Sequence, residues 1–277
     1  MWASVGGDGT GLQAALSDPS SLTEIKIRWV DCAKISRMAE PYELSARFYD
    51  RIYSFRDYQK EAASLRALIH ERHPSARTLI DVGCGTGSHL ALLRNWFDVE
   101  GVDASAPMLD VARQKLSGVP LHHGALTSFT IQRRFDVVVC LGSGIGYVRS
   151  VGELNSAVAN LTLHLAPGGL LIIEPWFTPE QWRTPGIVQG VMMVDEPELK
   201  VARFVVSETH GRMAVTPMHH LVATPEGVTH FLERHELFLA TSAEYEGALI
   251  KASLDRVAFV ENVVPRGAWV GGLPRSG

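Results

Sequence analysis

The chain has 277 residues, of which 46% are hydrophobic and 20% are charged. These proportions are those of an ordinary globular protein, and the length suffices for one domain with a sizeable core. A formal net charge of −4 provides no positive field for nucleic acid, and no apolar stretch approaches the ~20 residues that span a membrane. The three cysteines lack metal-ligand spacing and are typical of a reducing compartment. We therefore expect a cytoplasmic enzyme with no metal ion, no nucleic-acid partner and no membrane partner.

The N-terminal residues, 1–40, carry no recognisable motif, and their first part is rich in glycine, serine and alanine. Because Met38 could serve as a second start, we expect a poorly ordered N-terminal extension followed by the main domain at 41–277. An aromatic-rich stretch, Tyr42–Tyr53, leads into a helix predicted over Asp57–His70, where apolar residues recur on one face.

A β-branched and aliphatic run, Thr78–Val82, predicts a short buried strand of a parallel sheet. Glycines follow it at Gly83, Gly85 and Gly87, ahead of a helix expected over Ser88–Trp96. Glycine allows the backbone to turn tightly and to approach a ligand that no side chain would admit. The segment therefore predicts a strand, a binding loop and a helix in succession.

The spacing within and after this loop distinguishes between ligands. A dinucleotide loop would place a third glycine where Ser88 stands, and a P-loop would continue with Gly-Lys-Ser/Thr, which is absent here. An acid, Asp103, ends the next apolar run, 16 residues after Gly87. An ionised acceptor at this place would bind both hydroxyls of a ribose through charge-assisted hydrogen bonds. The pattern indicates a nucleoside ligand and no phosphate cradle.

Strands and helices continue to alternate, which predicts a parallel sheet covered on both faces, an α/β fold of the Rossmann-like kind. Ser105 is a candidate cap for the second helix. The expected elements are strands at 99–102, near 121, at 135–141 and at 170–174, and helices at 107–116 and 151–165. Because ligands collect at the carboxyl ends of such strands, the glycine loop, Asp103, Leu141–Tyr147 and Glu174–Phe177 should converge on one crevice.

The alternation breaks at 185–240, where apolar and polar residues alternate between glycine and proline turns. This pattern predicts an antiparallel β meander, inserted as a cover over the crevice or as an interface in a homodimer. Its expected strands are Lys200–Ser207, Arg212–Leu221 and Val228–Leu239. A helix at 242–252 and strands at 257–260 and 268–271 should then complete the main sheet.

The run from Asp81 to Gly87, together with Asp103, resembles motif I and the ribose-binding acid of the class I S-adenosylmethionine (SAM) methyltransferases. The resemblance implies a seven-stranded Rossmann-like sheet, SAM as methyl donor and S-adenosylhomocysteine as product. The cofactor-binding residues that it implies are Tyr49, Asp81, Gly83, Cys84, Gly85, Gly87, Asp103, Ala104, Met108, Ala125, Leu126 and Leu141.

A closer resemblance is carried by Phe48–Tyr53, Gly144–Tyr147, Pro167–Trp176 and Arg266–Gly271. These segments resemble the desosamine and mycaminose N,N-dimethyltransferases, which act on nucleotide-linked amino sugars in macrolide antibiotic biosynthesis. The similarity spans about 42–274 and implies N-methylation of an amino sugar nucleotide.

One segment departs from that family. After the third strand the family has an acid that holds the adenine amino group, within a Gly-Asp-Met-like segment, whereas Gly124 is followed here by Ala125 and Leu126. Adenine would then be held by backbone groups and by the apolar walls Leu126, Leu141 and Met108.

Methyl transfer from a sulfonium is an in-line displacement that depends chiefly on orientation, and an amine acceptor must be neutral when it attacks. By location, Tyr53 and Glu174 are the candidate catalytic residues. Tyr53 could equally form a wall or contact SAM, and Glu174 could pair with a basic residue.

Aromatic and basic side chains near the expected crevice are candidates for holding the acceptor, since rings can wall a sugar or heterocycle and arginines can pair with a diphosphate. Core packing and solvated surface positions are the alternative interpretations. The candidate substrate-binding residues are Tyr147, Arg149, Trp176, Phe177 and Arg266, and Arg183 is a further candidate for the diphosphate.

Three functions are thus open on the sequence. The first is N-methylation of a small-molecule acceptor, an amino sugar nucleotide, by in-line transfer from SAM. The second is O- or N-methylation of another natural product or metabolite. The third is a SAM-binding protein without catalysis, which the absent acid after Gly124 allows.

Overall fold

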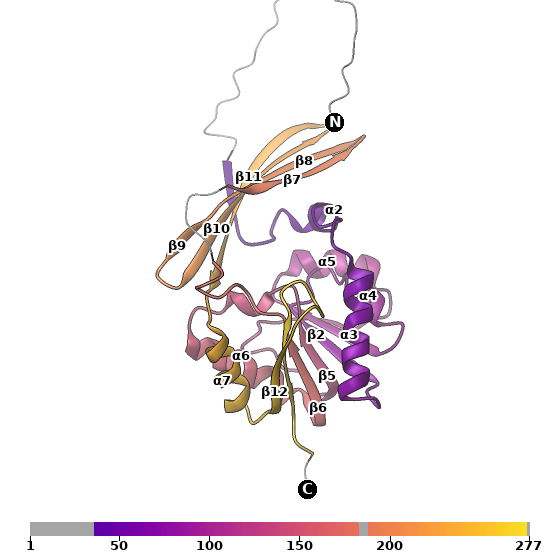
Figure 1. The fold of residues 1–277 in the computed structure, drawn as a ribbon. Helices are drawn as coiled ribbons and strands as arrows, with labels where there is room; N and C mark the ends of the chain where they lie inside the picture. Colours follow the sequence, from indigo (N-terminus) through magenta and orange to yellow (C-terminus); the bar gives the residue numbers. More distant parts are fainter. Residues whose placement is uncertain (1–35, 183–187, 276–277) are drawn as a thin grey trace, which may run out of the picture. The chain divides into compact units, whose positions relative to one another are not determined.

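The computed structural model describes residues 36–182 and 188–275, and Ser36 onward forms one compact unit. A seven-stranded sheet in this part of the chain carries the predicted α/β core (Figure 1). Its first five strands along the chain are parallel, and the last two turn back as an antiparallel pair. In spatial order the strands are β12 (Asp255–Val260), β13 (Ala268–Gly272), β6 (Leu165–Ile173), β5 (Phe135–Cys140), β2 (Thr78–Val82), β3 (Asp98–Asp103) and β4 (Leu121–His123). The Rossmann-like fold predicted from the sequence is confirmed.

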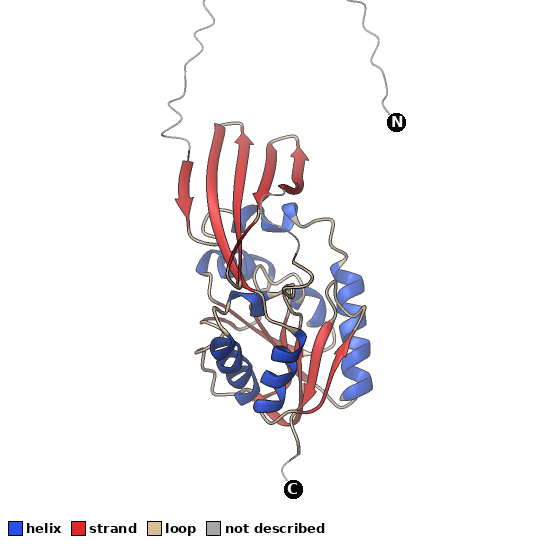
Figure 2. Ribbon diagram, turned by 60° about the vertical axis from the view of Figure 1, so that its left-hand side comes forward, coloured by secondary structure: helices blue, strands red, loops and turns tan. Residues whose placement is uncertain are grey.

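Helices cover both faces of this sheet, as Figures 1 and 2 show. Neighbouring residues of β2 point to opposite faces: Leu79 packs with α3 (Tyr58–Arg72), α4 (Leu90–Leu93) and α5 (Ala106–Lys115). Ile80 packs in the other core, with α6 (Val151–Leu163) and α7 (Ser242–Lys251). A strand buried on both faces must be apolar throughout, which explains the continuous hydrophobic runs from which these strands were predicted.

Side-chain caps set the starts of most of the longer helices. The hydroxyl of Ser105 accepts a hydrogen bond from the Met108 amide at 3.4 Å, as the sequence predicted. The helix expected over Ser88–Trp96 is wrong in length, because regular helix covers Leu90–Leu93 alone. Beyond it the amides of Asn95 and Trp96 bond three residues back, which tightens the chain into turns before β3 begins.

The predicted meander forms a second sheet, in the order β1 (Ser36–Ala39), β11 (Gly227–Phe238), β10 (Met213–Thr224), β8 (Leu199–Val206) and β7 (Val188–Glu196), with β9 (Glu208–His210) paired to β10. Its three expected strands are confirmed as β8, β10 and β11. The sequence missed β7 and β1. The latter pairs in parallel with β11, with Arg37 opposite Phe231. Residues 1–35 of the expected extension lie outside the described residues.

The inner face of the second sheet packs on two short helical segments, η2 (Ala46–Phe48) and α2 (Tyr49–Ile52). Phe48 and Ile52 share one apolar cluster with Phe231 and other strand residues. This contact holds the aromatic stretch in place between the sheet and the glycine loop.

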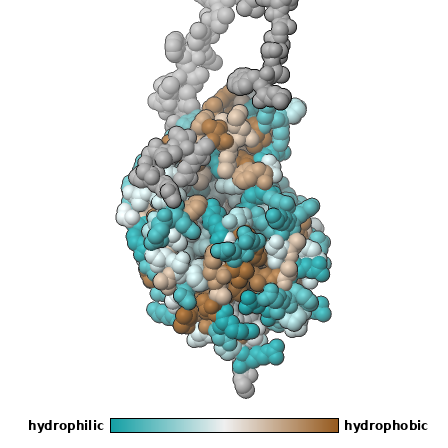
Figure 3. Space-filling model, viewed as in Figure 1, coloured by the Kyte–Doolittle hydropathy of each residue, from teal (hydrophilic) through white to brown (hydrophobic). Residues whose placement is uncertain are grey.

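The outer face of the second sheet leaves large apolar side chains exposed. Figure 3 shows brown residues among teal ones in the upper part of the molecule. Met193, Val228 and Leu221 are 72%, 66% and 45% exposed. The homodimer interface expected here stays a prediction. Among the helices of residues 36–182 and 188–275, none is long and apolar enough to cross a membrane.

Candidate active site

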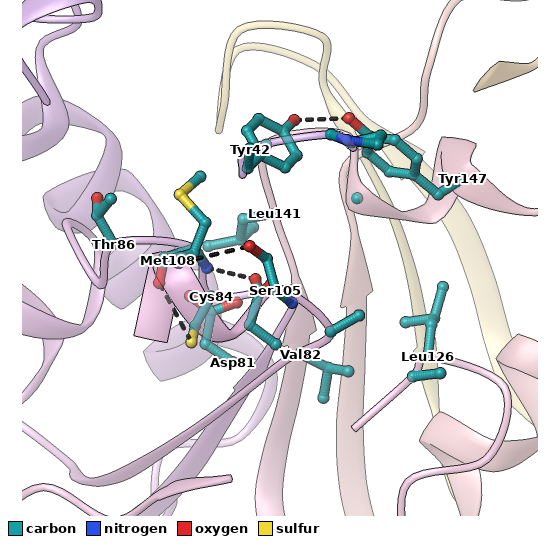
Figure 4. Close-up of a pocket in the computed structure, with 18 of the residues that line it drawn as sticks. Tyr42, Asp81, Val82, Cys84, Thr86, Ser105, Met108, Leu126, Leu141 and Tyr147 are labelled. Carbon is teal, nitrogen blue, oxygen red and sulfur yellow. Dashed lines mark hydrogen bonds between the residues drawn. The ribbon is translucent and has the colours of Figure 1, made fainter. Parts of the chain in front are cut away.

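A cavity of about 470 Å³ lies at the carboxyl ends of β2, β3 and β5. Twelve of the residues predicted to bind cofactor or substrate line it (Figure 4). They are Tyr49, Asp81, Gly83, Cys84, Gly85, Asp103, Ala104, Met108, Ala125, Leu126, Leu141 and Tyr147. The structure therefore brings together most of the cofactor residues that the motif implied.

The glycine loop wraps one end of this cavity. Gly83, Gly85 and Gly87 have φ angles of +83°, +55° and +76°, a left-handed backbone that glycine adopts without strain. A side chain at Gly87 would collide with Leu116, since a Cβ there would lie 2.4 Å from its Cδ1. Gly87 thus packs the loop against α5 and does not line the cavity.

The carboxylate of Asp103 is tied to the glycine loop by backbone hydrogen bonds. Its Oδ2 accepts from the Gly85 amide at 2.7 Å, and its Oδ1 accepts from the Ser105 amide at 2.8 Å. Burial raises the pKa of Asp103, and these amides partly counter that shift by favouring the charged form. Each oxygen retains a lone pair, so the carboxylate can also accept from the two hydroxyls of a ribose.

Asp81 offers a second carboxylate with a different environment. It is 1% exposed, and its Oδ1 has no hydrogen-bond partner among the described residues. Burial raises the pKa of Asp81 to about 7. A buried carboxylate oxygen without a donor is costly by itself, and an ammonium group at the cavity wall would satisfy it.

Arg56, which was not predicted as a site residue, also lines the cavity. Its guanidinium makes a bidentate pair with Glu61, at 3.1 Å and 2.6 Å. Although burial opposes the charge, Glu61 raises the pKa of Arg56, which stays a cation that can bind a carboxylate. The only local signal in the sequence is its place just before Asp57, the cap of α3.

These groups fit SAM. The ribose hydroxyls match Asp103, the amino-acid ammonium matches the unpaired oxygen of Asp81, and the amino-acid carboxylate matches Arg56. The apolar wall for adenine is formed by Met108, Leu126 and Leu141, and 124–127 contributes no carboxylate to the cavity, so the departure seen in the sequence persists.

A cluster of aromatic side chains closes the side of the cavity opposite the glycine loop. Figure 4 shows Tyr42 and Tyr147 facing one another, with their hydroxyls 2.7 Å apart. The Tyr147 hydroxyl also lies 2.7 Å from Nδ1 of His235. Neither Tyr42 nor His235 was predicted to have a role in the site, because tertiary packing alone brings the aromatic-rich stretch and β11 together at the cavity.

Three predicted residues line a second cavity of about 450 Å³ instead of the first: Trp176, Phe177 and Arg266. The Arg266 guanidinium lies over both rings, 4.8 Å and 4.7 Å from their centroids, and donates to the Ser143 hydroxyl at 3.2 Å. Ser143 lies in a turn, and the residues on either side of it, Gly142 and Gly144, line the first cavity. The two cavities therefore adjoin across this turn.

Glu174 lies between the cavities without lining either of them. It is fully buried, and its Oε2 accepts from the Gly142 amide at 2.7 Å. Its Oε1 is 3.6 Å from Arg266, and its Oε2 is 4.0 Å from Arg56. This is the pairing with basic residues that was one of the two interpretations of Glu174.

The remaining candidates lie apart from both cavities. The Tyr53 hydroxyl accepts from Arg203 at 3.1 Å, and its ring packs on Tyr49 with centroids 4.5 Å apart. Arg149 is exposed and meets the first cavity only through its neighbour Glu153, which accepts from the Arg149 amide. Arg183 lies outside the described residues.

Comparison with known proteins places this site in a family. Residues 79–169 match a family of methyltransferase domains. A dTDP-3-amino-3,6-dideoxy-alpha-D-glucopyranose N,N-dimethyltransferase from Streptomyces fradiae is 39% identical, covering 76% of this chain and 83% of the relative. A dTDP-3-amino-3,4,6-trideoxy-alpha-D-glucopyranose N,N-dimethyltransferase from Streptomyces venezuelae is 38% identical, covering 83% of this chain and 98% of the relative.

Solved structures of similar fold include sugar methyltransferases. The SAM-bound amino pentose methyltransferase CalS10, from Micromonospora echinaspora, superposes with a TM-score of 0.73 at 34% identity, covering 85% of this chain and 99% of that one. The crystal structure of DesVI from Streptomyces venezuelae gives a TM-score of 0.76 at 38% identity, with 83% and 98% covered. The chain therefore belongs to the family of SAM-dependent sugar N,N-dimethyltransferases, and SAM is its methyl donor.

Proposed function

We propose that this enzyme methylates the amino group of a dTDP-linked amino sugar. The relatives that share most of its length act on such compounds. The observation that carries the proposal is the second cavity, which adjoins the cofactor cavity and is lined by Arg266 and Trp176, whose Nε and Nε1 have no hydrogen-bond partner in the described chain. A nucleoside diphosphate supplies the acceptors that such donors require.

The second cavity suits a nucleotide in two further respects. Burial lowers the pKa of Arg266, and Glu174 at 3.6 Å opposes that shift, so the guanidinium stays charged beside the cavity. The rings of Trp176 and Phe177 offer flat apolar surfaces on which a base or a sugar ring can pack. The sugar would then extend past Ser143 toward the first cavity.

In the first cavity, Asp103 would hold the ribose of SAM while Asp81 and Arg56 hold its amino-acid end. SAM supplies an activated electrophilic methyl group. The protein's contribution is to fix the acceptor nitrogen in line with that group and to exclude water, which can remove several kcal/mol from the barrier. Tyr147 ends the short helical segment Gly144–Tyr147 that starts at the turn between the cavities, and its hydroxyl meets that of Tyr42 in the wall of the first cavity.

The direct test is incubation of the full chain with methyl-labelled SAM and a set of acceptors. The set contains dTDP-linked amino sugars, the matching dTDP sugar with a hydroxyl in place of the amine, and the free amino sugar. We expect label on the amine of the dTDP-linked compounds alone, with one S-adenosylhomocysteine released for each methyl group. Turnover only with acceptors that lack the nucleotide, or SAM binding without any turnover, would contradict the proposal.

A variant localises the nucleotide. Arg266→Gln should raise KM for the sugar nucleotide by about tenfold or more, because it removes a charged donor to the diphosphate, and should leave SAM affinity unchanged. The matched control is Arg256→Gln, at an exposed arginine on β12 that pairs with Asp255. Equal KM values for the two variants would place the diphosphate elsewhere.

A further inference from the structure

A chain of hydrogen bonds leads from the first cavity into the second sheet. The Tyr147 hydroxyl donates to the Tyr42 hydroxyl at 2.7 Å, and on its other side it lies 2.7 Å from Nδ1 of His235. The two tyrosines line the cavity, whereas His235 is fully buried on β11. The cavity is thus connected to a buried titratable group, His235, that itself lines neither cavity.

On the side of His235 away from the cavity, the buried carboxylate of Glu233 would stabilise a positive charge on the imidazole ring. Its Nε2 has no hydrogen-bond partner in the described residues and lies 3.8 Å from Oε2 of Glu233, an ion-pair distance when the ring is protonated. Glu233 is fully buried and accepts from the amides of Leu44 and Ser45, both at 2.9 Å, and from the Ser45 hydroxyl at 2.6 Å. These donors keep Glu233 ionised, so its charge stands ready behind the ring.

The other titratable groups around this pair do not compete for the proton. His220, on the neighbouring strand β10, is buried with both ring nitrogens unpaired among the described residues, and burial lowers its pKa to about 4. Arg203 stands opposite His220 on β8 and is already a cation. On the cavity side, burial is the main cause that raises the pKa of Tyr42 and of Tyr147 well above the usual range. Neither tyrosine can therefore keep a phenolate.

Other acids at the cavity are less suited to the task. Oε2 of Glu153 accepts from the Arg149 amide at the exposed rim. The carboxylates of Asp81 and Asp103 belong to the cofactor end, by the fit described above. Glu174 does not line the cavity.

Glu40 and His89 also line the cavity: Glu40 is exposed, and Nε2 of His89 lies 2.8 Å from Glu61. The tyrosine pair leads from the cavity to His235, a buried base that has no such partner on its Nε2 among the described residues.

We propose that His235 takes up the proton that the acceptor ammonium must lose before it can attack, and that Tyr42 and Tyr147 relay it. This rests on the proposed function, because it requires an amine acceptor. The Tyr147 hydroxyl, which donates to Tyr42 in the resting structure, first turns its proton toward Nδ1 of His235. One N–H proton then passes from the ammonium to the Tyr42 oxygen, the Tyr42 proton passes to the Tyr147 oxygen, and the Tyr147 proton passes to Nδ1 of His235. The nitrogen keeps the electron pair of the broken N–H bond as the lone pair that attacks, and the new imidazolium faces Glu233. His235 is thus a positioning residue that acts through the tyrosines.

The test is the pH dependence of kcat/KM for the amino sugar nucleotide. Free amines of this kind lose their proton near pH 8, so a relay matters below that pH and becomes dispensable well above it. We expect His235→Asn and Tyr147→Phe to lower kcat/KM by about tenfold or more near pH 7 and to approach the wild-type rate near pH 9.5. Tyr147→Phe removes one oxygen only, so it keeps the test valid if the histidine variant does not fold.

The matched control is His210→Asn, a substitution at an exposed histidine of the same sheet, which should leave the profile unchanged. SAM affinity should be equal in all variants. A rate that falls by the same factor at every pH, or does not fall, would overturn the relay and leave the proposed function standing. A wild-type enzyme that methylates no amino sugar at any pH would overturn the proposed function itself.

Discussion

Asp103 and Asp81 lie in one cavity, yet the structure gives them different tasks. Asp103 accepts two backbone amides, and its spare lone pairs face the place where a ribose fits. We predict that Asp103→Ala weakens SAM binding by about 1 to 3 kcal/mol, the usual loss of a charged hydrogen-bond acceptor, as measured by calorimetric titration. Asp110→Ala is the control, because Asp110 is exposed on α5. Equal SAM affinity in the two variants would put the ribose elsewhere.

Asp81 should make the ligand-free enzyme less stable as the pH rises. Burial raises its pKa from 3.8 to about 7, so its destabilising charge is absent below about pH 4 and complete above about pH 7. The loss amounts to about 4 kcal/mol, since one pKa unit corresponds to about 1.4 kcal/mol.

The variant Asp81→Asn cannot ionise and should escape this loss. Denaturant unfolding at a series of pH values should show the variant gaining stability over the wild type between pH 4 and pH 7, while SAM binding is weakened. Stability curves that run parallel over this range would show that Asp81 does not carry the raised pKa in the folded protein.

Residue roles could be predicted where spacing along the chain defines them. The glycines and Asp103 were found because a strand, a loop and the next strand fix their relative positions. Arg56, Tyr42 and His235 could not be found in this way, since tertiary packing alone brings them to the cavity. His235 lies 88 residues from the tyrosine that it contacts.

At the scale of elements, the glycine loop depends on close packing against α5. Gly87→Ala should lower the free energy of unfolding by about 2 to 4 kcal/mol, because a Cβ would both strain a left-handed backbone and collide with Leu116. Gly118→Ala separates the two causes: Gly118 has a φ of +79°, and a Cβ there would meet nothing within 4 Å. It should cost about 1 to 2 kcal/mol, the strain alone. Equal losses in chemical denaturation would contradict a collision at Gly87.

The elements that the sequence predicted are those with strong local patterns. We predicted β2 and β5 from their apolar runs and β11 from its alternating pattern. The strand β1 carries no such pattern and forms because its partner β11, nearly two hundred residues later, offers a free edge. The helix after the glycine loop was predicted too long, since its residues have helical periodicity but the chain must turn early to reach β3.

At the scale of the whole molecule, the sequence predicted one crevice, whereas the described residues of the predicted site divide between two adjoining cavities. Glu174 follows directly after β6, whose last residue is Ile173, and it is buried beside Gly142 and Arg266. The chain beyond it carries Trp176 and Phe177 to the second cavity. No local sequence pattern specifies whether the residues after Glu174 line the first cavity or the second. Two adjoining cavities are what a reaction between two nucleotide-like molecules requires, one for the donor and one for the acceptor.

The most direct test of this account is a crystal structure of the enzyme with S-adenosylhomocysteine and a dTDP-linked amino sugar. We predict the ribose of the cofactor product on Asp103, the diphosphate on Arg266, and the sugar amine beside Tyr42 and Tyr147. A cofactor product bound outside the glycine loop, or a nucleotide bound away from the second cavity, would contradict it.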